Sequence, residues 1–244
     1  MDRDVLTRRR VLTGVGAAGV AAFAGLGAAT RDSVRYTYAS THECDDATLT
    51  AEWRETYTRN GTTTLLENTT ADADAGENTG TENTADEPAI INLQNVLPED
   101  RGTISVRITA ESFDGVNSVT PTLDLVLDEA AENELIDPEG KAGDSSENTG
   151  ELQEFLDVKL WKDEGLLGVD ALGADNIEND IGEPTIAEGT LQEVTDTVDG
   201  ESLGTINNEG GDVSIAFRWG FTDESNINIT QTDSVTFTFD VGCS

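Results

Sequence analysis

Apolar and polar side chains alternate along several stretches of the chain, and a period of two is typical of half-buried β-strands. The alternation is clearest at Ile104, Val106 and Ile108 and in residues 213–219 and 235–241. The stretches 34–38, 49–53, 123–127 and 155–161 also predict strands. Turns that contain Gly and Asp separate these strands, so the pattern indicates a mainly β protein, an antiparallel β-sandwich with long acidic loops.

One segment has the spacing of a helix instead. Leu191, Val194 and Val198 follow one another at intervals of three and four residues, after Pro184 and Gly189. This spacing places the three side chains on one face of a helix. We therefore expect one short helix within an otherwise β-rich domain.

The composition changes abruptly in residues 67–88, which hold almost nothing apolar beyond Ala. Such a segment cannot bury enough surface to order itself, so it is interpreted as a mobile, low-complexity insertion. The remaining length suits one domain, residues 30–244, with the insertion inside it.

The first 29 residues have the layout of an export signal. Arg8, Arg9 and Arg10 precede a long stretch of Gly, Ala and other small or apolar residues. The paired Arg followed by Val11 and Leu12 resembles the twin-arginine export motif. A membrane anchor is the alternative, but the Gly and Ala content makes the stretch weakly apolar. We expect an extracellular or cell-surface protein without stable membrane insertion after the signal is removed.

The charge of the chain points to concentrated salt. Asp and Glu number 49 against 14 Lys and Arg, and without residues 1–29 the net charge is about −37. High ionic strength shortens the Debye length to about 3 Å at 1 M and so relieves the self-repulsion of a compact state. Nucleic acid is an improbable partner at this charge. Disorder is the competing interpretation, but the strand patterns argue against it for most of the chain.

Two cysteines are present, Cys44 and Cys243. In an exported protein such a pair is interpreted as a disulfide, with unpaired thiols or pairing between subunits as alternatives.

Candidate catalytic chemistry is sparse. His42 is the single histidine, so a hydrolytic zinc site is improbable, and it is interpreted as an exposed loop residue. The acidic run from Asp170 to Asp180 fails the spacing of a calcium loop. Neither a catalytic residue, a metal ligand nor a cofactor is assigned, and the protein is expected not to be an enzyme. Hydrolysis of a glycosidic bond by two acids stays an alternative, because the chain has so many carboxylates that no pair stands out.

Three N-glycosylation sequons fit export, at Asn60, Asn68 and Asn228, although a chain rich in Asn and Thr produces some by chance.

Three segments together resemble the TasA/camelysin-like secreted proteins, in particular their haloarchaeal relatives. They are NLQNVLPED at 92–100 before an alternating strand, GELQEFLDVKLW at 150–161, and WGF at 219–221 with QTDSVTFTF at 231–239. The first is similar to the family's N-[LV]-x-P-G-D turn. Glu99 stands where the family has Gly, which is a departure from the pattern.

The resemblance implies a jelly-roll-like sandwich and, in several family members, assembly into fibres or pili of the extracellular matrix. In such assemblies a strand of one subunit completes the sheet of the next. The candidate donor strand contains Val34, Tyr36 and Tyr38, although this segment could equally pair within its own subunit. Self-association or contact with other surface proteins is therefore expected. A monomeric secreted or surface-associated binding domain is the alternative, and a secreted hydrolase is the weaker third possibility.

Overall fold

The computed structural model describes residues 34–39, 41–44, 47–68, 81–83, 89–94, 96–133, 136–146, 149–163, 183–221 and 227–243. All of them belong to one compact unit, Ser33–Ser244, while a second unit comprises Met1–Asp32. The export segment 1–29, with Arg8, Arg9 and Arg10, lies outside the described residues. No helix in the described part of the chain is long and apolar enough to cross a bilayer.

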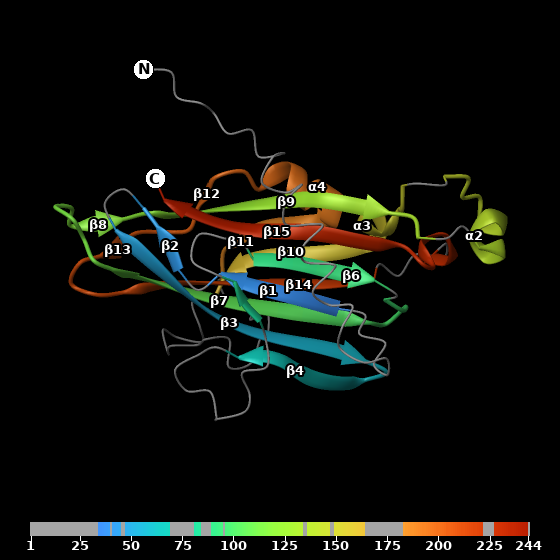
Figure 1. The fold of residues 1–244 in the computed structure, drawn as a ribbon, viewed down its shortest axis with the longest axis horizontal. Coiled ribbons are helices and arrows are strands. Elements are labelled where there is room, and N and C mark those ends of the chain that lie inside the picture. The colour runs from blue at the N-terminus through green and yellow to red at the C-terminus, as the bar shows by residue number, and fades with distance from the viewer. Residues whose placement is uncertain are drawn as a thin grey trace, which may run out of the picture. The chain divides into compact units, whose positions relative to one another are not determined.

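Two large sheets make up most of the unit (Figure 1). The six-stranded sheet has the order β12-β9-β15-β6-β1-β5. Its strands are β12 (Glu201–Ser202), β9 (Pro121–Ala131), β15 (Ser234–Cys243), β6 (Ala89–Gln94), β1 (Val34–Ala39) and β5 (Thr81–Asn83). All neighbours are antiparallel except β1 and β5, which are parallel.

The seven-stranded sheet has the order β11-β10-β14-β7-β3-β2, and β4 pairs with the far half of β3. Its strands are β11 (Thr185–Thr190), β10 (Leu156–Lys162), β14 (Asp212–Phe221), β7 (Arg101–Glu111), β3 (Thr48–Arg59), β2 (Thr41–Glu43) and β4 (Thr62–Asn68). Every pairing in it is antiparallel. A separate two-stranded ribbon joins β8 (Ser118–Val119) and β13 (Ile206–Asn207).

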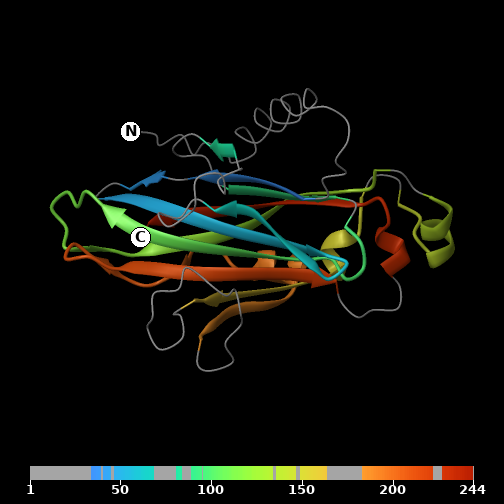
Figure 2. The same ribbon diagram turned by 90° about the horizontal axis from the view of Figure 1, so that it is seen from below.

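The two large sheets pack face to face over an apolar core (Figure 2). Phe217 of β14 lies 5.1 Å from Phe239 of β15, centroid to centroid, with the rings edge to face. Trp53 of β3 meets the same Phe239 ring at 6.5 Å. Aromatic pairs in this geometry contribute about 0.5–1.5 kcal/mol beyond their buried area. The predicted antiparallel sandwich is therefore confirmed in its sheets and in its core.

The alternating positions identified in the sequence are the positions that face this core. Ile104, Val106 and Ile108 are all at most 2 % exposed in β7. The same holds for Leu49 and Trp53 in β3, and Val235, Phe237 and Phe239 in β15. Side chains alternate across a strand, so a buried inner face requires an apolar residue at every second position.

The structure has more helix than the single short helix that the sequence predicts. That helix is present as α4 (Leu191–Thr197), where Thr190 caps the first turn and accepts a hydrogen bond from the Glu193 amide. Two more are α2 (Asp137–Ala142) and α3 (Leu152–Phe155), and a 3₁₀ turn, η2, spans Ile227–Thr230. Both extra helices are too short to show a helical apolar period, so the pattern alone could not reveal them.

The boundaries of the predicted insertion, residues 67–88, also differ. Strand β4 extends to Asn68, and β5 forms at Thr81–Asn83 by backbone pairing with β1. Backbone pairing needs no apolar side chain, which is why composition did not indicate it. The rest of the insertion lies outside the described residues.

Candidate functional site

Five carboxylates from five separate positions along the chain converge where α2, α3 and η2 lie together, at the right of Figure 1. We call this group the carboxylate centre. Its members come from the residue after β9, from α2, from the loop after α2, from the residue before α3 and from the residue before β15. They are Glu132, Glu139, Asp144, Glu151 and Asp233.

The carboxylate oxygens form two overlapping triplets. Glu132, Glu139 and Asp233 each offer one oxygen within 4.8 Å of the others, and Glu132, Asp144 and Glu151 do the same. Glu132 belongs to both triplets and so joins them into one centre. Only the folded chain brings these groups together, because they are spread from residue 132 to residue 233.

The centre is largely closed to solvent. Glu139 is 0 % exposed, Asp233 1 % and Asp144 8 %. Gly150 packs directly against it: a Cβ at this position would lie 2.7 Å from the carbonyl oxygen of Ala131 and 2.8 Å from the carboxyl carbon of Asp233. Both distances are shorter than any normal contact, so only glycine fits beside the Asp233 carboxylate.

Hydrogen bonds from nearby loops orient four of the five carboxylates. Asp233 Oδ2 accepts a hydrogen bond of 2.6 Å from the amide of Glu151, and Asp144 Oδ1 accepts one of 2.8 Å from the amide of Ser146. Glu151 Oε1 accepts from the Ser146 hydroxyl at 2.9 Å, and Glu139 Oε2 from the Ile136 amide at 2.7 Å. The loops around the centre are thus built to orient the carboxylates.

The second oxygens point to a different role. Asp144 Oδ2, Glu151 Oε2 and Asp233 Oδ1 are buried and accept no hydrogen bond from the described residues. A buried carboxylate oxygen without a donor is costly, and buried charges in proteins are normally paired or bound to a metal. Glu132 lies within hydrogen-bonding reach of Asp144 and Asp233, so these oxygens can take either a proton shared with Glu132 or a bound cation.

The electrostatics of the centre favour uptake of positive charge. Burial, together with the charges of Glu132 and Glu151, raises the pKa of Asp233 to about 7. Burial also raises the pKa of Glu139 and of Glu151, again with neighbouring carboxylates contributing. The pKa of Asp144 is lowered, because the Ser146 amide donates to its charged form. Such a group can hold protons in acid or a cation near neutral pH.

Hard cations match the chemistry of these donors. An all-oxygen, carboxylate-rich set is what Ca²⁺ and Mg²⁺ take, whereas Zn²⁺ in proteins usually binds His or Cys as well. Sequence reasoning assigned no metal ligand and missed all five residues. Two of the five, Glu151 and Asp233, lie in the segments 150–161 and 231–239, which were singled out for their resemblance to the family and not for their carboxylates.

The predicted disulfide is confirmed. Cys44 and Cys243 are bonded, with their Cα atoms 6.0 Å apart. The bond closes a loop of 199 residues and ties the residue after β2 to the end of β15. Cross-linking so long a loop restricts the unfolded chain strongly, by about 5 kcal/mol in the chain-entropy model.

The other predicted site residues are dispersed. Val34, Tyr36 and Tyr38 lie in β1, which pairs with β6 of its own chain. Asn60 is exposed at the turn between β3 and β4, where its φ is 51° and Gly61 follows with a φ of 71°. Asn68 ends β4 and Asn228 lies in η2. His42 lies in β2 opposite Leu49, so it is in a short strand and not in a loop.

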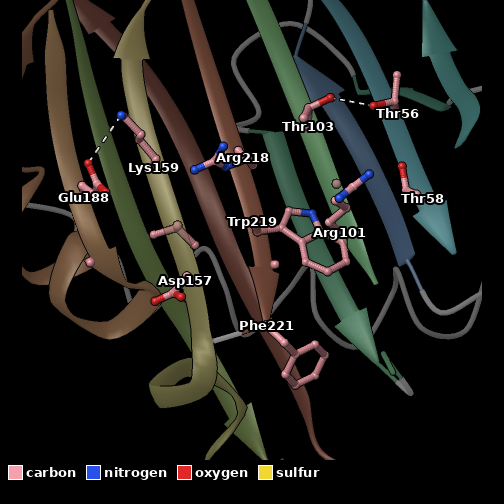
Figure 3. A pocket seen from close by; sticks show the side chains of 14 residues that line it. Thr56, Thr58, Arg101, Thr103, Asp157, Lys159, Glu188, Arg218, Trp219 and Phe221 are labelled. Carbon is pink, nitrogen blue, oxygen red and sulfur yellow. Dashed lines mark hydrogen bonds and ion pairs between the residues drawn. The ribbon is translucent and has the colours of Figure 1, made fainter. Parts of the chain in front are cut away.

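A second feature is a polar hollow of about 740 Å³ on the seven-stranded sheet (Figure 3). Its lining crosses five strands, from Thr56 on β3 to Glu188 on β11. Arg101, Lys159 and Arg218 contribute three cations to it, and Lys159 lies 3.5 Å from Glu188. The acidic run from Asp170 to Asp180 lies outside the described residues.

Comparisons with protein families, with curated proteins and with solved structures find no match to this chain.

Proposed function

We propose that this protein is an exported, salt-adapted structural subunit with a TasA-like jelly-roll fold. It acts by shape and association instead of by catalysis, and it assembles into extracellular fibres, pili or matrix by strand addition. The observation that carries this proposal is the position of β1 at one side of the six-stranded sheet, ahead of the disulfide.

Strand β1 is attached to its sheet mainly through β6. The register runs from Val34 opposite Leu93 to Thr37 opposite Ile90, and the outer neighbour β5 is only three residues long. Because β1 precedes Cys44, it can leave the sheet while the Cys44–Cys243 bond stays intact. If β1 left the sheet, the backbone N–H and C=O groups of β6 would be exposed. Strand β1 of another copy could then pair with β6 in the same register.

The turn before β7 belongs to the first of the three segments that resemble the TasA/camelysin-like proteins. Asp100 is 2 % exposed and closes the turn by accepting from the Leu97 amide at 2.8 Å. Glu99 has a φ of 75°, a conformation that favours glycine. Glycine is the residue that the family pattern has at this position, so the backbone of the turn suits that pattern although the side chain departs from it.

Exchange of β1 can be measured by cross-linking between copies. Two single variants, Thr37→Cys and Ile90→Cys, are mixed in molar KCl under mild oxidation. Since residues 37 and 90 are opposite each other in the β1–β6 register, we expect a disulfide-linked dimer of the two variants, and filaments of the wild type by electron microscopy. Asp137→Cys mixed with Ile90→Cys is the control for random collision.

The proposal fails if the mixed variants link no more than the control pair and the wild type stays monomeric at high concentration. Deletion of residues 34–39 should abolish assembly. The far-ultraviolet circular dichroism spectrum of the deleted chain must still show β structure, so that the loss of assembly is not caused by unfolding.

The competing function is a monomeric binding domain, and the hollow on the seven-stranded sheet favours it. Three cations line this hollow against two carboxylates, Asp157 and Glu188, and this excess of positive charge in a chain with a net charge of −35 suits an anionic ligand. This function becomes the better one if the protein stays monomeric and Arg101→Gln weakens its binding to an anionic polysaccharide in molar salt.

A further inference from the structure

We propose that the carboxylate centre binds calcium, and that the ion fastens the end of the sandwich at which α2, α3 and η2 meet. This inference is independent of the proposed function, because it concerns residues that take no part in strand exchange.

The first argument is the arrangement of the oxygens. Asp144, Glu151 and Asp233 each use one oxygen to accept a hydrogen bond from the surrounding loops, and each leaves the other oxygen buried and without a donor among the described residues. Metal-binding carboxylates are commonly oriented in this manner, by donors that fix one oxygen while the other coordinates. A merely solvated acidic surface would expose the second oxygens to water, whereas Asp233 is only 1 % exposed.

The second argument is the spacing. Ca²⁺ binds oxygen at about 2.3–2.6 Å, so two ligands of one ion lie at most about 5 Å apart. Within each triplet the offered oxygens lie within 4.8 Å of one another. Each triplet is therefore compact enough to share a single ion, and Glu132, which belongs to both, can bridge two ions if both positions are filled.

The third argument concerns the choice of ion. Ca²⁺ tolerates irregular sets of six to eight oxygens and is satisfied by several carboxylates, whereas Mg²⁺ requires near-octahedral geometry and usually retains several waters. Two overlapping carboxylate triplets that are closed by Gly150 and Ala131 favour the larger, less hydrated ion. The Thr232 hydroxyl, 3.2 Å from Glu132 Oε1 and 3.4 Å from Glu139 Oε1, adds a further oxygen beside the first triplet.

The consequence for the fold follows from where the ligands lie. Glu132 follows β9 and Asp233 precedes β15, two strands that are neighbours in the six-stranded sheet. Glu139, Asp144 and Glu151 belong to the chain that leaves β9, forms α2 and returns to α3. An ion bound by ligands from both groups would join the segment between β9 and α3 to the six-stranded sheet. Without the ion, the carboxylates in this region repel each other.

Calorimetric titration of the chelator-treated protein with CaCl₂, in 2 M KCl to screen the acidic surface, tests the inference. The wild type should bind one or two Ca²⁺ ions per chain, with MgCl₂ at least about tenfold weaker, and should gain thermal stability from calcium. Asp233→Asn removes one buried ligand charge with little change of shape, and it should weaken calcium binding by at least about tenfold. The matched control is Asp137→Asn on α2, whose side chain is 93 % exposed and should not matter.

Two results would overturn the inference. One is the absence of both binding heat and a thermal shift at millimolar CaCl₂ in the wild type. The other is equal weakening, or no weakening, in Asp233→Asn and Asp137→Asn, because this would mean that calcium associates with the acidic surface in general. The circular dichroism spectrum of each variant is recorded without calcium, and Asp144→Asn serves as the second test if Asp233→Asn does not fold.

Discussion

Two buried aspartates in this protein lie in opposite electrostatic environments. Asp100, 2 % exposed, forms an ion pair of 2.6 Å with Arg59 and accepts hydrogen bonds from the Tyr57 hydroxyl and the Leu97 amide. Asp233, 1 % exposed, accepts from the Glu151 amide, and the charges that act on it come from Glu132 and Glu151. The chain neutralises the first aspartate itself, whereas the second is surrounded by charge of its own sign.

This difference separates two sources of stability. The turn that contains Asp100 and the core over Phe217 and Phe239 are complete within the chain, so their stability should depend little on the ions present. The carboxylate centre concentrates buried negative charge, so its stability should depend on protons or a cation supplied by the solution. Four predictions can break or sharpen this contrast.

The largest effect of a single substitution is expected beside Asp100, whose charge the chain itself neutralises. Arg59→Met removes the cation from buried Asp100 and should lower the free energy of unfolding by about 3 kcal/mol, since breaking a buried pair leaves an uncompensated charge. Denaturant unfolding in molar KCl measures the loss, which should be the same with and without calcium. Arg101→Met, at an exposed arginine on the neighbouring strand, is the control and should change stability by less than about 0.5 kcal/mol. A loss that calcium restores would abolish the contrast.

The second effect is a pH dependence of the calcium-free protein. Because the folded-state pKa of Asp233 is raised from 3.8 to about 7, the folded chain holds a proton that the unfolded chain releases. The stabilisation is thus fully present below about pH 4 and is lost as pH rises to about 7, by up to about 1.4 kcal/mol per pH unit for one such group. Unfolding of the wild type and Asp233→Asn at several pH values isolates this contribution. Parallel curves for the two proteins would contradict it.

A third, smaller effect is expected beside the centre. Gly150→Ala places a Cβ 2.7 Å from the Ala131 carbonyl oxygen and 2.8 Å from the Asp233 carboxyl carbon, so the carboxylate must move. Calcium affinity should fall by about tenfold, equivalent to about 1.4 kcal/mol. Gly140→Ala, within α2 where a Cβ meets nothing within 4 Å, should leave affinity unchanged. Equal effects of the two substitutions would show that the centre is not tightly packed.

The smallest effect returns to the turn at Asp100. Glu99→Gly removes the strain of a left-handed backbone, about 1–2 kcal/mol, but it also frees the unfolded chain, at a cost of about 0.4–1 kcal/mol. A net gain of about 0.5–1 kcal/mol is expected by denaturant unfolding. Glu99→Ala retains the Cβ and should bring no such gain; an equal gain would mean that the side chain of Glu99, and not its backbone, is unfavourable.

The sheets and their core could be predicted from the sequence because a strand that is half buried must alternate. The residues at 104, 106 and 108 and at 235, 237 and 239 show this alternation, and all six face the core. The disulfide could be predicted for a simpler reason, since the chain has only Cys44 and Cys243. The strands are predicted by a signal that is local in the sequence. The disulfide is predicted because two cysteines allow only one pairing within the chain.

The carboxylate centre could not be predicted in the same way. With 49 acidic residues in the chain, no single Asp or Glu stands out, and Glu132 and Asp233 meet only because β9 and β15 are neighbours in the sheet. Helices α2 and α3, which carry or flank three of the five ligands, are too short to have a detectable period. Gly150 was part of a recognised segment, but its need for glycine arises from the approach of Ala131 and Asp233 in space.

Hydrogen exchange of single backbone amides tests the contrast between the two regions most directly. The amides of Glu151, Ser146 and Ile136 donate to carboxylates of the centre, and the amide of Leu97 donates to Asp100. On addition of calcium in molar KCl, exchange at the first three should slow by at least about tenfold while exchange at Leu97 stays the same. Equal slowing at all four amides, or no slowing at any, would contradict the claim that calcium stabilises the carboxylate centre and leaves the turn at Asp100 unaffected.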